Sequence, residues 1–373
     1  VTRVWGIPIR IHVSLLVVLP VFAWLIGNGV QLEVYAALVN ALAGTSIDAA
    51  ALQGGTLPWI IGSVAAVGLF VSVTLHELGH AYVALRYDLE VESITLWILG
   101  GLASLGQIPK EWKKEFWIAL AGPVVSVLVG VGCLVAVAVL PELNQPTTFV
   151  VGWIGATNIL LAVFNMLPAF PMDGGRILRA LLARNRPYAK ATQLAGRIGT
   201  GFALLFAVVG VLQFSPMLLI LAVFIYGAAS SESRAVLLGE LLEGVTVGDL
   251  TGDRGDGVPA STSVTEMVDR MFADRQSTFV VTQGGEPVGV VTVADFKRLT
   301  PEERDTTTVG DLMTTELPTL DATTPAFDGL IALDSGRVSA AFVDGPGGRR
   351  VVSRTDFAEA LEMRRLLGTR GPF

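Results

Sequence analysis

The stretch that decides the fold and the chemistry of this 373-residue chain is His76-Glu77-Leu78-Gly79-His80. It lies inside the apolar run 58–85, which carries no other charged residue. On a helix, His76 and His80 share one face because they are four residues apart. Two neutral imidazoles on one face can hold a zinc ion, and the glutamate between them can act as a base on water at the metal. Because a carboxylate and two imidazoles are costly inside an apolar helix, the stretch indicates function.

The composition around this stretch indicates an integral membrane protein. The chain is 52% hydrophobic and 16% charged, whereas soluble proteins carry about 25% charged residues. Six apolar segments have about the length of a membrane span: 11–27, 58–85, 116–140, 149–167, 198–214 and 217–230. The last two are short and are separated only by Ser215-Pro216, so a helical hairpin is the alternative for them.

The placement of positive charge predicts the orientation in the membrane. Lys and Arg occur in the N-terminal stretch and in the loops after the second and fourth segments, and the other inter-segment loops have none. By the positive-inside rule, we expect a multi-pass protein of the cell membrane with cytosolic N- and C-termini. The first segment lacks a small-residue cleavage site, so we do not expect a cleavable signal. The histidine pair should then lie a few turns inside the membrane from the cytosol.

The end of the fourth segment supplies a candidate third ligand. A catalytic zinc usually has three protein ligands, and the histidine pair provides two. The prolines at 168 and 171 cannot continue a regular helix, so we expect unwound backbone that lines a cavity. Asp173 follows them at a depth that matches His80 and is the predicted ligand; a helix-capping or turn aspartate is the alternative. Asn165 is predicted to donate a hydrogen bond to substrate or to a developing oxyanion, or else to cap freed backbone groups.

Residues 91–105 are rich in β-branched and aromatic side chains and break at Gly100-Gly101. This pattern predicts two short strands or a hairpin rather than a helix. The edge of such a hairpin can accept an extended peptide as an added strand, so Gly100 and Gly101 are the candidate substrate-binding residues. A structural flap is the alternative. Residues 32–42, between the first two segments, show a helical pattern to which we assign no function.

The last third of the chain is acidic and contains a repeat. Residues 1–244 carry 13 acidic and 13 basic groups, and residues 245–373 carry 20 and 13, so the tail holds the whole net charge of −7. An acidic tail argues against nucleic acid as a partner. The motif 246–250 recurs at 308–312, and the motif 291–296 recurs at 352–357. Two such units are expected to pair and bury one core. We therefore expect a membrane domain at 1–235, a linker at 236–244, and repeat units at 245–300 and 301–373.

The membrane part resembles the site-2 protease family of intramembrane zinc metalloproteases. The resemblance rests on H-E-x-x-H at 76–80, on Asn-x-x-Pro-x-x-Pro-x-Asp-Gly at 165–174 and on the six-span frame, with support from Gly100-Gly101 and Ala121-Gly122-Pro123. It covers roughly residues 1–230. Met172 stands where the family usually has leucine, which is a volume-conserving change.

That resemblance implies roles for individual residues. It implies one Zn²⁺ per chain, with His76, His80 and Asp173 as its ligands. It implies that Glu77 is the catalytic base. Asn165 matches the family's motif asparagine, which helps to bind substrate or to stabilise the transition state.

The tail is similar to a tandem pair of CBS (cystathionine-β-synthase) domains. The family's Gly-hydrophobic-hydrophobic-Thr/Ser-x-x-Asp signature occurs at 289–295 and, with arginine in place of glycine, at 350–356. The resemblance implies contacts to the phosphate and ribose of an adenine nucleotide from Thr292, Asp295, Ser353 and Asp356. The alternative is a pair that serves only to form a homodimer.

The sequence thus predicts a multi-pass α-helical membrane protein, with six transmembrane helices and a short membrane-associated β-hairpin, followed by a soluble α+β CBS domain pair. The predicted function is zinc-dependent cleavage of transmembrane protein substrates (regulated intramembrane proteolysis), regulated by the cytosolic pair. A metal-ion transporter and a nucleotide-sensing membrane scaffold are the alternatives. The lack of charged residues in segments 116–140, 198–214 and 217–230 argues against transport, and the intact ligand set argues against the scaffold.

Overall fold

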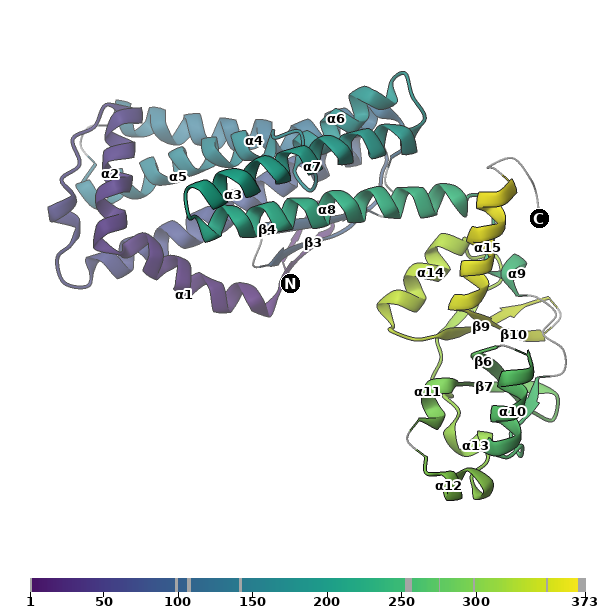
Figure 1. Cartoon of the computed structure of the whole chain (residues 1–373). Helices are drawn as coiled ribbons and strands as arrows, with labels where there is room; N and C mark the ends of the chain where they lie inside the picture. The colour runs from purple at the N-terminus through teal and green to yellow at the C-terminus, as the bar shows by residue number, and fades with distance from the viewer. Residues whose placement is uncertain are drawn as a thin grey trace. The chain divides into compact units, whose positions relative to one another are not determined.

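The computed structural model describes residues 2–97, 100–105, 109–140, 143–251, 257–274, 276–297, 299–346 and 348–367. The chain divides into two compact units, Val1–Arg234 and Ala235–Phe373. The first unit consists mainly of long helices, and the second mixes short helices with small sheets (Figure 1).

Within the described part of the first unit eight α-helices begin, and they account for the apolar segments of the sequence. They are α1 (Val13–Gly27), α2 (Gly29–Ala43), α3 (Leu57–Arg86), α4 (Trp112–Val139), α5 (Gln145–Asn165), α6 (Asp173–Ala183), α7 (Tyr188–Leu212) and α8 (Pro216–Leu241), with a 3-10 turn at Ala49–Leu52. Among the described residues, five of these helices are long and apolar enough to cross a membrane. The count is six if α1 and α2, bent by 72° at their junction, form one span.

The surfaces of these helices are those of a membrane protein. Large apolar side chains are exposed along them, for example Val64 on α3, Leu128 on α4 and Val208 on α7. A soluble monomer rarely exposes apolar surface on this scale, whereas lipid tails would cover it. Helices α7 and α8 are 25 and 26 residues long. Both exceed the apolar segments that mark them in the sequence, because each extends beyond its apolar part into polar residues.

A four-stranded sheet belongs to the same unit, with strand order β1-β2-β3-β4. The predicted hairpin is present as β3 (Val91–Trp97) and β4 (Gly100–Leu105), which pair antiparallel. Two further strands, β1 (Thr2–Val4) and β2 (Ile7–Ile11), were not predicted from the sequence. They are joined by Trp5-Gly6, both with positive φ as a tight hairpin turn requires, and β2 pairs parallel to β3. Strand β4 therefore lies at one edge of the sheet.

The helical chain breaks after α5 at the two prolines, and α6 begins at Asp173. Two glycines allow the connecting loop to fold against the first turn of α6. A Cβ at Gly174 would lie 2.3 Å from the carbonyl oxygen of Leu167, and a Cβ at Gly175 would lie 2.6 Å from the carbonyl carbon of Ala169. Only glycine fits such close backbone approaches, so the Gly-Gly pair holds Asp173 next to the broken stretch.

The second unit contains two three-stranded sheets. One has the order β5-β6-β7, from Val258–Pro259, Thr278–Gln283 and Glu286–Thr292. The other has the order β10-β9-β8, from Gly348–Ser353, Ala340–Gly345 and Thr319–Asp321. The helices are α9 (Val247–Leu250), α10 (Val264–Asp274), α11 (Val293–Phe296), α12 (Pro301–Thr306), α13 (Val309–Leu312), α14 (Ala326–Ser335) and α15 (Arg354–Leu367).

The two repeats of this unit exchange their first helices. Helix α9 packs into the core of the second repeat, and α13 packs into the core of the first. The same backbone bond anchors both: Gly248 N–H donates to the Ala322 carbonyl and Gly310 N–H to the Ala260 carbonyl, each at 2.9 Å. Each repeat thus completes the core of the other, and this is why two copies are needed. The boundary between the two repeat units, placed from the sequence at residue 300, stays a prediction.

Candidate metal centre

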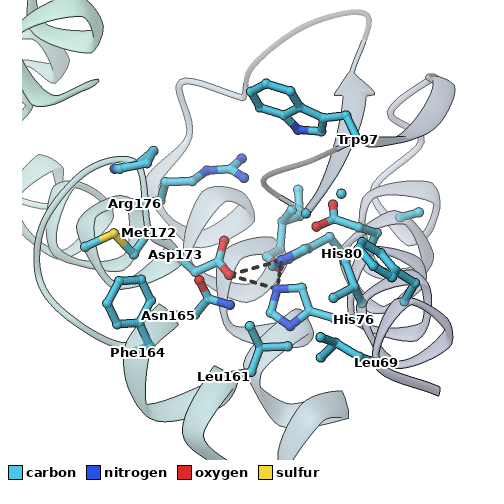
Figure 2. A pocket seen from close by; sticks show the side chains of 18 of the residues that line it. Leu69, His76, His80, Trp97, Leu161, Phe164, Asn165, Met172, Asp173 and Arg176 are labelled. Atoms are coloured by element: carbon cyan, nitrogen blue, oxygen red, sulfur yellow. Dashed lines mark hydrogen bonds and ion pairs between the residues drawn. The ribbon is translucent and has the colours of Figure 1, made fainter. Parts of the chain in front are cut away.

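Three buried polar side chains from α3 and α6 meet in the first unit (Figure 2). The Nε2 atoms of His76 and His80 lie 3.1 Å apart, and each lies 3.2 Å from Oδ2 of Asp173. Ligand atoms at zinc–ligand distances of about 2.0–2.1 Å in a tetrahedron are about 3.3 Å from one another. The triangle has this size and consists of nitrogen and carboxylate donors. The three residues therefore fit one zinc ion.

Helix α4 orients both imidazoles from behind. Nδ1 of His80 lies 2.6 Å from the carbonyl oxygen of Ile118, and Nδ1 of His76 lies 2.9 Å from Oγ of Ser126. A carbonyl oxygen can only accept, so the His80 proton sits on Nδ1 and its Nε2 lone pair faces the triangle. With the same tautomer, His76 donates to Ser126. Such outer partners fix ligand orientation and raise ligand basicity.

Helix α4 also approaches the imidazoles at Gly122. A Cβ at this position would lie 2.3 Å from Nε2 of His80 and 2.7 Å from Nε2 of His76. Any side chain at residue 122 would therefore compete for the space beside the metal-binding nitrogens. From the sequence, Gly122 was noted only as part of Ala121-Gly122-Pro123 in the family resemblance, without a role, and Ser126 was not singled out because a lone serine in an apolar span carries no recognisable signal.

Glu77 lies beside the edge strand of the sheet. A Cβ at Gly101 on β4 would be 2.3 Å from Cγ of Glu77 and 3.0 Å from its Oε1. The predicted base and a predicted substrate-binding residue are thus brought into direct proximity, although 24 positions separate them. Gly100 has a φ of 129°, a conformation that favours glycine. Like Glu77 and Gly101, it lines the cavity described next.

A cavity of about 570 Å³ connects these residues. It is lined by the two histidines, Glu77, Asp173, Gly100, Gly101, Asn165, Trp97 and Arg176, among mostly apolar neighbours. In Figure 2 the side chain of Asn165 lies beside Asp173 at one wall. No described residue forms a hydrogen bond with the Asn165 side chain. The alternative role of Asn165, capping backbone groups that the helix break leaves free, is therefore not supported by any hydrogen bond among the described residues.

Comparison with known proteins shows the family. The model of peptidase family M50 matches residues 64–149 and 141–207, and the CBS domain model matches residues 257–302. The zinc metalloprotease MJ0392 of Methanocaldococcus jannaschii is 32% identical over 303 residues, which cover 81% of this chain and 80% of that protein. The chain belongs to peptidase family M50. Its reaction class is therefore that of a zinc metalloprotease.

Two further proteins are similar to this chain. The putative zinc metalloprotease Rip3 of Mycobacterium tuberculosis is 32% identical over 325 residues, covering 83% of this chain and 78% of that protein. Among solved structures, the site-2 protease from Methanocaldococcus jannaschii is 33% identical and covers 63% of this chain and 94% of that one, with a TM-score of 0.42.

A buried ion pair holds α6 in place in this M50 peptidase. Arg179 is 1% exposed, and its Nε donates to Oε1 of the fully buried Glu115 on α4 at 2.7 Å. It also pairs with Glu232 on α8. Its guanidinium carbon lies 5.0 Å from each of two ring centroids, those of Phe170 and Tyr188. Breaking a buried pair is strongly destabilising, so Arg179 fixes the helix that begins with Asp173. Sequence analysis counted it only as a cytosolic positive charge.

The candidate nucleotide residues of the M50 peptidase's tail form two local hydrogen-bonded pairs, of which Thr292 and Asp295 make a capping box. Oδ2 of Asp295 accepts from Thr292 N–H at 2.7 Å and from its hydroxyl at 2.8 Å. Oδ2 of Asp356 accepts from Ser353 N–H at 2.6 Å and from its hydroxyl at 3.0 Å. Each pair starts the helix that follows, α11 or α15. This local role needs no ligand, and nucleotide binding remains a prediction.

Proposed function

We propose that this protein hydrolyses peptide bonds of membrane-spanning protein substrates at a zinc ion held by His76, His80 and Asp173. The observation that carries the proposal is the buried triangle of donor atoms with sides of 3.1–3.2 Å, supported from behind by α4. His76 and His80 lie on α3, which is itself a candidate span, and this supports a site within the membrane. Membership of peptidase family M50 supports the reaction class.

The residues around the triangle have distinct tasks in hydrolysis. When bound, zinc supplies Lewis acidity, which polarises the scissile carbonyl and makes water at the site more acidic. Glu77 takes one proton from that water while the water oxygen forms a bond to the carbonyl carbon. Glu77 then delivers this proton to the amide nitrogen as the C–N bond breaks, which leaves a carboxylic acid and an amine. Asn165 donates a hydrogen bond to the substrate carbonyl.

The sheet edge supports a way to present the substrate. A helical substrate hides its carbonyl groups in internal hydrogen bonds, so the segment to be cleaved must first become extended. Strand β4 is the edge strand of its sheet, and it passes Glu77 at Gly101. We infer that the extended segment adds to β4 as a further strand, which places its backbone beside the carboxylate. Gly100 and Gly101 are the proposed contact residues.

The tail supports a regulatory role in this proposal. The CBS family match and the paired repeats are consistent with a module that gates access to the site in response to a ligand such as an adenine nucleotide, or that forms a homodimer. The positive-inside pattern supports cytosolic termini in the cell membrane and an opening of the site toward the cytosol.

Comparison of membranes from cells that express either the wild type or Glu77→Gln tests the proposal. We expect quantitative proteomics to find membrane-anchored proteins that are cleaved only with the wild type and that co-purify intact with Glu77→Gln. Zinc uptake into vesicles should be the same for both, because transport is not the function. Identical fragment patterns in the two membranes would contradict the proposal.

A further inference from the structure

Arg176 stands out among the residues of the cavity. It lies three residues after Asp173 on α6, so the two residues share one face of the helix. It is half-buried and lines the same cavity as Glu77 and Asn165. In Figure 2 its guanidinium extends above Asp173 into the space below Trp97.

The bonding of Arg176 differs from that of its neighbour one turn later. Arg179 is held by Glu115 and Glu232, whereas no described residue forms a hydrogen bond or an ion pair with Arg176. A half-buried guanidinium in a mostly apolar cavity is costly unless it gains a partner. The cavity therefore contains five N–H donors that have no acceptor among the residues that the structure describes, in a place where a substrate would bind.

The charges of the site indicate which partner would suit it. With one zinc ion bound and neutral histidines, the carboxylates of Asp173 and Glu77 balance the two positive charges of the metal. Arg176 is the sole cationic side chain among the described lining residues, and none of the carboxylates among them forms an ion pair with it. When Glu77 accepts a proton, its negative charge passes to the carbonyl oxygen of the substrate. A fixed cation that faces this oxygen stabilises the transition state more than the ground state.

We propose that Arg176 is a catalytic residue that donates from its guanidinium to the scissile carbonyl oxygen and stabilises the negative charge that develops there. This inference rests on the proposed function and extends it. Asn165 provides a neutral donor at the same wall of the cavity, so that one charged and one neutral group together face the oxygen. The planar guanidinium presents several donors in fixed directions, and lysine cannot reproduce this arrangement with its single ammonium.

Kinetics of the full-length enzyme in micelles test the inference, with a membrane-anchored substrate and with zinc content measured for every variant. Arg176→Gln should lower kcat/KM by about 100- to 1,000-fold, mainly through kcat, and leave zinc per chain unchanged. Arg176→Lys should retain only part of the activity. Millimolar methylguanidine should raise the rate of Arg176→Ala, because the cavity can admit it, and should not affect the wild type. Arg186→Gln is the matched control, because Arg186 is exposed in the turn after α6 and does not line the cavity.

Four results would overturn the inference. They are an unchanged rate for Arg176→Gln, a higher KM at constant kcat, no response of Arg176→Ala to methylguanidine, and loss of zinc, which would show that Arg176 only positions Asp173. If the wild type cleaves, Glu77→Gln does not and Arg176→Gln cleaves at the wild-type rate, this inference fails and the proposed function stands. If the zinc-loaded wild type does not cleave membrane-anchored substrates, both fail.

Discussion

The polar residues of the membrane unit and those of the tail are satisfied in different ways. His76 meets Asp173 across 97 positions of the chain, whereas Thr292 meets Asp295 over three. Helix capping alone accounts for the pairs in the tail, because each pair lies at the start of a helix. The membrane triangle has no such local purpose, and burying it is costly unless a metal ion compensates. Polar groups that converge from distant elements therefore point to function more strongly than a matching local motif does.

Of the changes predicted here, removal of a zinc ligand should have the largest effect. Asp173→Ala deletes one corner of the triangle, so we expect zinc affinity to fall by more than the roughly 10- to 100-fold loss that follows loss of an outer partner. Proteolysis should disappear with the metal. Elemental analysis of the purified protein measures zinc per chain. Glu90→Ala is the control, because Glu90 is exposed on the same unit. A full zinc complement in Asp173→Ala would show that the triangle is not the metal site.

A methyl group added beside the same triangle should weaken zinc binding by a smaller amount. In Gly122→Ala the new methyl group would lie within 2.3 Å of Nε2 of His80, so the imidazoles must shift. Such overpacking typically costs about 1–3 kcal/mol, and we expect it to appear as weaker zinc binding. Gly132→Ala on the same helix is the matched control, since a Cβ there meets nothing within 4 Å. Equal zinc affinity in the two variants would remove Gly122 from the account of the site.

The outer partner of His76 should have a measurable effect of its own. Ser126→Ala removes the acceptor for Nδ1 of His76 at 2.9 Å. We expect a 10- to 100-fold loss of zinc affinity, about the range typical of such partners. Competition with a chromogenic chelator measures it. If the affinity stays within twofold of the wild type, Ser126 does not orient the ligand.

The tail should show the smallest effect. Asp295→Ala removes the N3 residue of a capping box and should cost about 0.3–1.5 kcal/mol of stability, without change in zinc content or proteolysis. Asp249→Ala is the matched control, because Asp249 forms the same box with Thr246 outside the predicted nucleotide set. Thermal unfolding with and without ATP separates the two roles. Loss of ATP stabilisation in Asp295→Ala alone would show that the aspartate also binds nucleotide, and equal behaviour would show capping only.

The capping box of Asp249 also predicts a pH dependence. Hydrogen bonds from the backbone and then the hydroxyl of Thr246 lower the pKa of Asp249. The stabilisation is therefore present above the ordinary aspartate pKa of about 3.9 and is lost as the pH falls through the lowered value. The difference in stability between the wild type and Asp249→Ala should accordingly shrink in strong acid.

Much of the site could be predicted because its key residues carry rare patterns. Two of the three histidines fall in one H-E-x-x-H stretch, and the prolines at 168 and 171 mark the break before Asp173. The apolar segments predicted the long helices, and the β-branched and aromatic residues of 91–105 predicted the hairpin. The expected break at Gly100-Gly101 was wrong, because both glycines pair with β3 as part of β4. Ser126 and the carbonyl of Ile118 could not be found, because their roles depend on how α4 packs against α3. The exchange of α9 and α13 was equally hidden, since a repeat does not reveal which copy completes which core.

The most direct test of the central claim measures zinc and cleavage together in purified full-length protein. Glu77→Gln leaves the triangle of ligands intact and removes the carboxylate that moves the proton. The account predicts about one zinc per chain in both the wild type and Glu77→Gln, with cleavage of a membrane-anchored substrate at least about 100-fold slower in the variant. Cleavage by zinc-loaded Glu77→Gln at the wild-type rate would contradict the account.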